Sequence, residues 1–157
     1  MVFKKRKDEV PGASSVDQCD ACFKDGLNCT QALLSTYGPQ FGLERESALK
    51  VAAAFGSGMG MGETCGAVTG ALMVIGLKNT KVKGLTFLSK EKTTDLAQEL
   101  VARFKARHGV VLCRELLGCD VSTPEGRKMA KAEKYFKQKC PAFVHDAAEI
   151  VEELLKE

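Results

Sequence analysis

The stretch GSGMGMGETCGAVTGALMVIGL, residues 56–77, places a cysteine between two glycine patterns. Glycines alternate with other residues before Cys65 and recur at a spacing of four within the apolar segment after it. A spacing of four puts Gly66 and Gly70 on one face of a helix, where small residues let a second helix approach closely. The stretch therefore predicts a glycine-rich loop followed by a central, tightly packed helix, with a thiol at the junction.

Helical patterns account for most of the remaining chain. Residues 91–108 carry apolar side chains at spacings of three and four, residues 44–55 are rich in alanine, and Pro141 suits the first turn of a last helix. We further predict one helix from Val16 to about residue 34 with a weak point at Gly26, a short turn after Cys113, and a helix from Pro124 to about residue 139. Residues 78–90 are predicted to be a loop, and the apolar residues 109–112 have no obvious strand partner. We expect an all-α, single compact domain of about six to seven helices.

Composition and charge narrow the class of protein. The chain has 23 Lys+Arg against 20 Asp+Glu, a net charge of +3, which lacks the basic excess of a nucleic-acid-binding protein. No apolar run approaches the roughly 20 residues that cross a bilayer, and the N-terminus lacks the apolar region of a secretory signal. We expect a cytoplasmic protein that neither binds nucleic acid nor spans a membrane, with residues 1–14 as a flexible basic tail and residues 15–157 as a cysteine-rich helical redox domain.

The seven cysteines are the main functional signal. An odd number of thiols without an export signal favours metal binding or thiol chemistry over a disulfide framework. Cys65, Cys113 and Cys140 each fall at the start of a predicted helix, where unpaired N–H groups and the helix dipole favour a thiolate. On the predicted first helix, Cys22 and Cys29 would face one interior point.

The alternating glycines suggest a binding loop. Gly58, Gly60 and Gly62 free the backbone to wrap a bound group and to aim N–H donors at it, and Gly66 adds a further donor at the helix start. No strand precedes these glycines and no Gly-Lys-Ser/Thr follows them, so they do not form a dinucleotide or Walker loop.

Four segments together resemble one family. They are Phe23-x-x-Gly26-x-x-Cys29, the block Cys65-Gly66-Ala67-Val68-Thr69-Gly70, Cys113-Arg114-Glu115-Leu116-Leu117-Gly118, and Cys140-Pro141. This order is similar to the C_GCAxxG_C_C family of redox-active proteins, from about residue 23 to the C-terminus. The family's four cysteines fall on Cys29, Cys65, Cys113 and Cys140, whereas Cys19, Cys22 and Cys119 lie outside the pattern.

The resemblance implies a redox role and leaves three mechanisms open. The first is electron transfer through an iron–sulfur cluster, [2Fe–2S] or [4Fe–4S], held by the four family cysteines. The second is a thiol–disulfide protein or thiol sensor in which Cys65 attacks and another cysteine resolves. The third is a structural zinc or an interaction module. Because Cys22 is followed by Phe23, the chain has no C-x-x-C-H for covalent haem. We expect a redox partner protein of unknown identity and leave a homodimer open.

Overall fold

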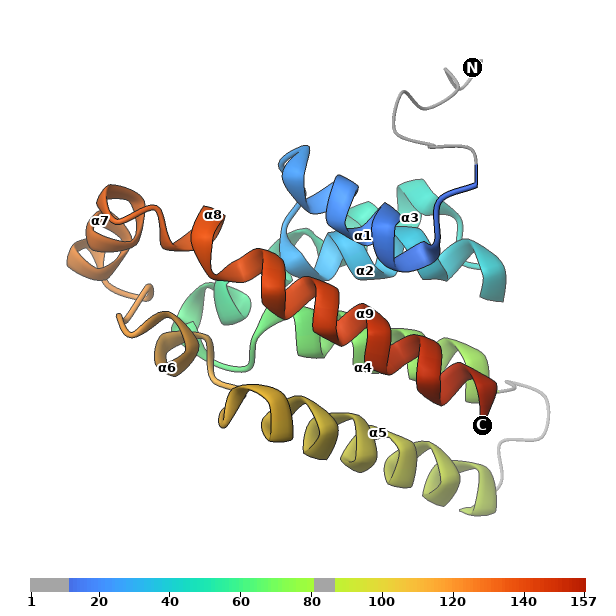
Figure 1. The fold of residues 1–157 in the computed structure, drawn as a ribbon. Coiled ribbons are helices and arrows are strands. Elements are labelled where there is room, and N and C mark those ends of the chain that lie inside the picture. Colours follow the sequence, from blue (N-terminus) through green and yellow to red (C-terminus); the bar gives the residue numbers. More distant parts are fainter. Residues whose placement is uncertain (1–11, 81–86) are drawn as a thin grey trace.

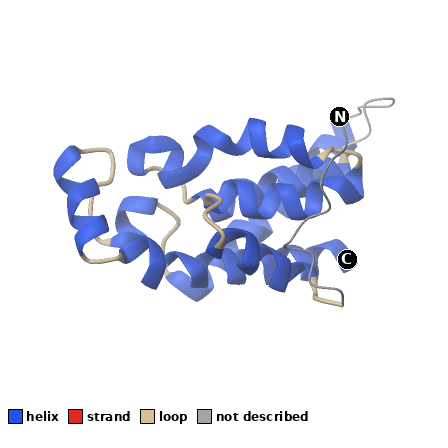
Figure 2. Cartoon of the chain, turned by 90° about the horizontal axis from the view of Figure 1, so that it is seen from above, coloured by secondary structure: helices blue, strands red, loops and turns tan. Residues whose placement is uncertain are grey.

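The computed structural model describes residues 12–80 and 87–157, and within these ranges the chain forms helices joined by short loops (Figure 1, Figure 2). The α-helices are α1 (Ser15–Lys24), α2 (Cys29–Tyr37), α3 (Arg45–Val51), α4 (Gly66–Asn79), α5 (Phe87–His108), α6 (Cys113–Leu117), α7 (Pro124–Ala132), α8 (Tyr135–Gln138) and α9 (Cys140–Lys156). Short helical turns follow α2, α3 and the start of the glycine stretch, at η1 (Gly38–Phe41), η2 (Ala52–Phe55) and η3 (Gly58–Gly62). The prediction of an all-α fold is confirmed.

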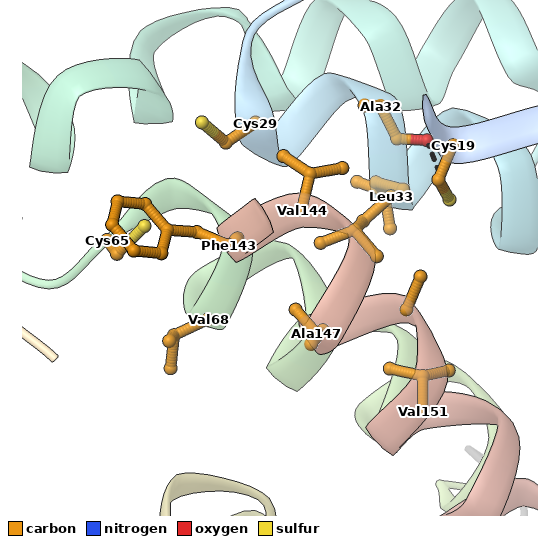
Figure 3. Packing of buried hydrophobic residues seen from close by; sticks show 14 of the residues in the cluster. Cys19, Cys29, Ala32, Leu33, Cys65, Val68, Phe143, Val144, Ala147 and Val151 are labelled. Carbon is orange, nitrogen blue, oxygen red and sulfur yellow. Dashed lines mark hydrogen bonds between the residues drawn. The ribbon is translucent and has the colours of Figure 1, made fainter. Parts of the chain in front are cut away.

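The last helix organises the packing. α9 runs across the molecule and contacts α1, α4 and α5, while α2 packs along α4 (Figure 1). Figure 3 shows Val144, Ala147 and Val151 of α9 in the core together with Leu33 of α2 and Val68 of α4. All five side chains are fully buried, so one continuous apolar core joins these helices.

The two glycines of α4 explain how closely α2 and α4 approach. A Cβ on Gly70 would lie 3.1 Å from both the Leu33 Cβ and the Thr30 Cα, and a Cβ on Gly66 would lie 2.8 Å from the Thr30 Oγ1. Real Cβ contacts are rarely this short. The close helix approach that the glycine spacing predicts is therefore present, and α2 is the helix that uses it.

The predicted helix from Val16 to about residue 34 is wrong, because the chain forms two helices there. Gly26, in the turn between α1 and α2, adopts a left-handed conformation with φ of 101°, which a helix cannot contain. Asn28 then caps α2: its side chain accepts from the Gln31 N–H at 2.9 Å, and the Gln31 side chain accepts from the Asn28 N–H at 3.1 Å. This capping box places Cys29 at the first position of α2.

A second predicted helix is also divided. Residues 124–139 form α7 and α8, separated by Lys134 in a left-handed conformation with φ of 56°. Residues 109–112 form no strand, but Leu112 pairs with Thr64 in an isolated antiparallel bridge. The glycine stretch thus supplies the partner that the sequence did not reveal.

The predicted loop over residues 78–90 is shorter than expected, since α4 continues to Asn79 and α5 begins at Phe87. Residues 81–86 of that loop and residues 1–11 of the predicted tail lie outside the described residues. Within the described ranges, no helix has the length and apolar character needed to cross a membrane.

Candidate cysteine site

Cys29, Cys65, Cys113 and Cys140 line one pocket of about 590 Å³. No other cysteine among the described residues lines it. The wall is mainly apolar, and the remaining lining residues are Phe23, Lys24, Gly26, Leu27, Asn28, Ser57, Gly66, Leu116, Leu117, Phe136, Lys137, Pro141 and Phe143. The fold therefore brings together four thiols that are separated by up to 111 positions in the chain.

Each of the four thiols sits at the start of a different helix. Cys29, Cys113 and Cys140 are the first residues of α2, α6 and α9, and Cys65 is the N-cap of α4. The sequence predicts three of these positions but not that of Cys29, because its pattern predicts one helix through this region with a weak point at Gly26. Four helix N-termini, each with unpaired N–H groups and a partial positive charge, thus converge on the pocket.

Backbone hydrogen bonds hold Cys65 beside Cys113. The Cys65 N–H donates to the Val111 carbonyl at 2.8 Å, and the Cys113 N–H donates to the Glu63 carbonyl at 2.7 Å. The Arg114 guanidinium also forms an ion pair with the Glu63 carboxylate at 2.6 Å. These contacts tie the start of α6 to the segment that enters α4.

Polar side chains fix the start of α2, which carries Cys29. The Thr30 hydroxyl donates to the Gly66 carbonyl at 2.9 Å, which joins the first turn of α2 to the first turn of α4. The Asn28 amide donates to the carbonyls of Ala52 and Ala53 at 3.2 Å and 3.1 Å. The residues that flank Cys29 are thereby anchored to both η2 and α4.

The start of α9, which carries Cys140, is joined to the end of α6. Lys139 donates to the Leu117 carbonyl at 2.6 Å, and its ammonium group lies 4.0 Å from the centre of the Tyr135 ring. The residue before Cys140 therefore connects α8, α9 and the helix that carries Cys113.

Burial and neighbouring groups give the thiols of Cys29, Cys65 and Cys113 different pKa values. The pKa of Cys65 is lowered, chiefly by its interaction with the Cys29 thiol, with help from the N–H groups of Ala67 and Val68 at the start of α4. The Cys65 side chain makes no hydrogen bond of full cap geometry, so these N–H groups act mainly through their charge. The interactions with Cys140 and Cys65, together with burial, raise the pKa of Cys29. Burial raises the pKa of Cys113 to about 12. Cys65 is thus the thiol best suited to be the first thiolate.

The predicted glycine residues divide into two groups. Gly66 lines the pocket, whereas Gly58, Gly60 and Gly62 do not, although Ser57 beside them does. All three have positive φ, and a Cβ on Gly58 would lie 2.5 Å from the backbone N of Glu63. In the structure these glycines shape the turn that brings the chain to Glu63, and a binding role for them stays a prediction.

The cysteines outside the family pattern have other surroundings. Cys19 and Cys22 are buried between α1 and α2, where the Cys19 thiol donates to the Ala32 carbonyl and the Cys22 sulfur accepts from the Thr36 hydroxyl. The expectation that Cys22 and Cys29 face one interior point is wrong, because only Cys29 lines the pocket. Cys119 is half-buried and also lies outside the pocket lining.

Sequence reasoning missed the apolar wall of the pocket. Leu116 follows Cys113 by three positions, and Phe136 and Phe143 lie four before and three after Cys140. Leu116 and Phe143 share a helix with their cysteine, so a spacing of three places each of them on the same face as the thiol. That spacing was a usable signal once the helix starts were assigned.

The separation of the sulfur atoms bears on what the pocket can hold. Zinc bonded to four thiolates at about 2.3 Å requires sulfurs roughly 3.8 Å apart. Among the described residues, no three cysteine sulfurs lie within 4.8 Å of one another, and the set of ligand atoms that meets this limit belongs to His145, Asp146 and Glu149. Arg107 already pairs with both of those carboxylates, at 3.2 Å and 2.6 Å. The thiols are therefore spaced around a cavity and do not converge on one point.

Comparison with known proteins identifies the family of the chain. The model of the C_GCAxxG_C_C family, whose description reads "Putative redox-active protein", matches residues 27–154, so the chain belongs to this family. The match includes all four pocket cysteines. No curated protein and no solved structure matches the chain.

Proposed function

We propose that this member of the C_GCAxxG_C_C family is an electron-transfer protein whose Cys29, Cys65, Cys113 and Cys140 thiolates bind an iron–sulfur cluster. One observation carries the proposal: four thiols from four helix starts line a single, mainly apolar pocket. Four cysteine thiolates are the common ligand set of both [2Fe–2S] and [4Fe–4S] clusters.

The residues present fit such a group better than a single metal ion. The pocket of about 590 Å³ has room for a multinuclear centre, and its sulfurs are too widely spaced for one tetrahedral ion. The four helix starts supply partial positive charge to a group that thiolate ligation makes negative. The spacing of the thiols and their charge environment both support the cluster over zinc.

The chain's own residues would bind the group and tune it. When bound, the cluster would supply reversible one-electron chemistry. Phe136, Phe143 and Leu116 would exclude water from the pocket, which strengthens the electrostatic effect of the nearby N–H groups. Hydrogen bonds and partial charges near the sulfurs raise the reduction potential of such centres. We therefore expect the helix starts to set the potential.

Anaerobic purification or reconstitution, followed by iron and sulfide quantification and a visible spectrum, tests the proposal. We expect visible charge-transfer bands and acid-labile sulfide, both lost when any pocket cysteine is changed to serine. Cys119→Ser is the matched control, since Cys119 lies outside the pocket, and it should keep the bands. A colourless protein without iron after reconstitution would overturn the proposal.

The pairing of Cys29 with Cys65 in one pocket favours a second candidate, a dithiol redox protein. Both thiols line the same pocket, and the neighbouring Cys29 thiol helps to give Cys65 the lowered pKa that an attacking thiolate needs. In this reaction the Cys65 thiolate attacks a partner's disulfide, and the Cys29 thiol then displaces the partner. The two cysteines lose two electrons and two protons, and the partner's disulfide becomes two thiols. A thiol count that falls by two on mild oxidation in the wild type, but not in Cys29→Ser, would support this candidate.

A further inference from the structure

One end of the molecule carries an excess of positive side chains that the pocket chemistry does not use. The segment of α7 and α8 holds more basic than acidic residues: Arg127, Lys128, Lys131, Lys134, Lys137 and Lys139 against Glu125 and Glu133. Arg127 and Lys139 are already engaged, since they donate to backbone carbonyls. The other four lysines are exposed and form no ion pair with a described residue.

The lysines of α7 lie on its solvent-exposed side, and the helix packs closely on the loop that precedes it. α7 buries Gly126 and Ala130, which lie one turn apart, so Lys128 and Lys131 fall on the opposite face. A Cβ on Gly126 would lie 1.7 Å from the Asp120 carbonyl oxygen, which shows how closely α7 sits on the preceding loop. The charges are thus held on a fixed surface.

Two lysines also line the cysteine pocket itself. Lys137 of α8 and Lys24 of α1 are both exposed, and both line the pocket although they are far apart in the sequence. Figure 1 shows α8 next to the end of α9 that begins with Cys140, with α7 packed on the far side of α8. We call Lys24, Lys128, Lys131, Lys134 and Lys137 the basic face.

Acidic residues elsewhere do not neutralise this face. The acidic side chains of α9 lie further along that helix, and Arg103 and Arg107 of α5 pair with most of them. Near the basic face, Asp25, Glu115, Asp120, Glu125 and Glu133 offset part of this charge, whereas Arg127 and Lys139 add to it. Two exposed lysines therefore line the pocket, and the neighbouring segment of α7 and α8 holds a local excess of positive charge although the net charge of the chain is only +3.

From this arrangement we infer that the basic face is the docking surface for a redox partner protein with an acidic face, which approaches over the mouth of the pocket. The inference rests on the proposed redox function and names the kind of partner. Complementary charge steers such encounters and orients the two sites. Met129 of α7 is 50% exposed within the same surface and gives the interface an apolar contact.

The first experiment measures binding of a fluorescent peptide of consecutive glutamates, with and without a bound cluster. The triple variant K128E/K131E/K134E should weaken binding by at least about tenfold at low ionic strength. K90E/K92E/K156E is the matched control, because these exposed lysines of α5 and of the last turn of α9 change the net charge equally but lie outside the basic face. In the corresponding Lys→Gln variants the loss of binding should be smaller, and the basic-face variant should again lose more than the control. Circular dichroism checks that each variant folds.

Ionic strength and a second probe sharpen the result. Raising the salt from about 0.01 M to about 0.1 M shortens the screening length from about 30 Å to about 10 Å, so wild-type binding should fall steeply while the triple variant changes little. Equal losses in the two triple variants would overturn the inference, because net charge alone would then explain binding. Tighter binding of a duplex DNA of equal charge than of the peptide would overturn the assignment to an acidic protein.

The redox step is tested separately in the cluster-loaded protein. Oxidation by an anionic complex such as ferricyanide should slow in K128E/K131E/K134E, and oxidation by a cationic cobalt complex should not. If no cluster can be loaded, the proposed function fails, but peptide binding still tests the surface. If the cluster loads and the rates with the two complexes do not diverge, the docking surface fails and the redox function stands.

Discussion

Replacing Gly70 with alanine should destabilise the protein, although alanine is the better helix former. Gly70 lies inside α4, where alanine is normally favoured by about 1 kcal/mol over glycine. The added Cβ, however, would lie 3.1 Å from the Leu33 Cβ, 3.1 Å from the Thr30 Cα and 3.2 Å from the Thr30 carbonyl oxygen. Two of these three atoms belong to the backbone of α2, which cannot rotate away.

The magnitude follows from the two opposing effects. Inserting a methyl group into a packed interface costs about 1–3 kcal/mol, from which the helix preference subtracts about 1 kcal/mol. We expect a net loss of about 1 kcal/mol in the free energy of unfolding, or about 3 °C in Tm for a chain of this size. Gly70 does not line the cysteine pocket, so the change should leave the site intact.

Gly76 provides the matched control on the same helix. A Cβ there would meet no atom within 4 Å, so Gly76→Ala should raise the free energy of unfolding by about 0.5–1 kcal/mol. Urea unfolding followed by circular dichroism measures both variants. If Gly70→Ala is as stable as Gly76→Ala, the α2 and α4 backbones are not as closely packed as we describe, and the explanation of the glycine spacing is refuted.

Three further predictions concern single contacts. Thr30→Val removes the hydroxyl that donates to the Gly66 carbonyl at 2.9 Å, and it should lower the free energy of unfolding by about 1 kcal/mol; an unchanged urea midpoint would contradict this. Asp20 raises the pKa of His145, so this contact stabilises the fold below the usual histidine pKa of 6.5 and fades as pH rises. His145→Gln should therefore cost about 0.5 kcal/mol at about pH 5.5 and almost nothing at about pH 8.5, and thermal unfolding at both values checks the sign. In the reduced, metal-free protein, iodoacetamide should modify Cys65 at lower pH than Cys113, as peptide mass spectrometry would show, because the pKa of Cys65 is lowered and that of Cys113 is about 12. Earlier labelling of Cys113 would contradict that order.

The helix content could be predicted because it depends on local patterns. The helix boundaries at residues 25–28 were also readable in principle, since Asn28 and Gln31 have the spacing of a capping box and Gly26 is a typical helix end. By contrast, Lys134 divides α7 from α8 although lysine gives no signal for a left-handed conformation. Such a break reflects how the two helices are packed, which a single sequence does not report.

The site was predictable only in part for a related reason. Periodicity identifies the face that a helix buries, but it does not identify which helix covers that face. The order of the four cysteines pointed to a common role, and their positions at helix starts pointed to thiolates. Their meeting at one pocket depends on contacts distant in the sequence, such as the bridge between Thr64 and Leu112 and the bond from Lys139 to Leu117. No local pattern encodes these contacts.

The two sources of positive charge near the pocket act at different ranges because water screens them differently. The helix starts that carry Cys29, Cys65, Cys113 and Cys140 are buried, so salt screens their partial charges less than it screens exposed charges. The lysines of the basic face are exposed, and salt screens them within about 10 Å at moderate ionic strength. The buried charges are therefore suited to set the properties of a group inside the pocket, and the exposed lysines to recruit what exchanges electrons with it.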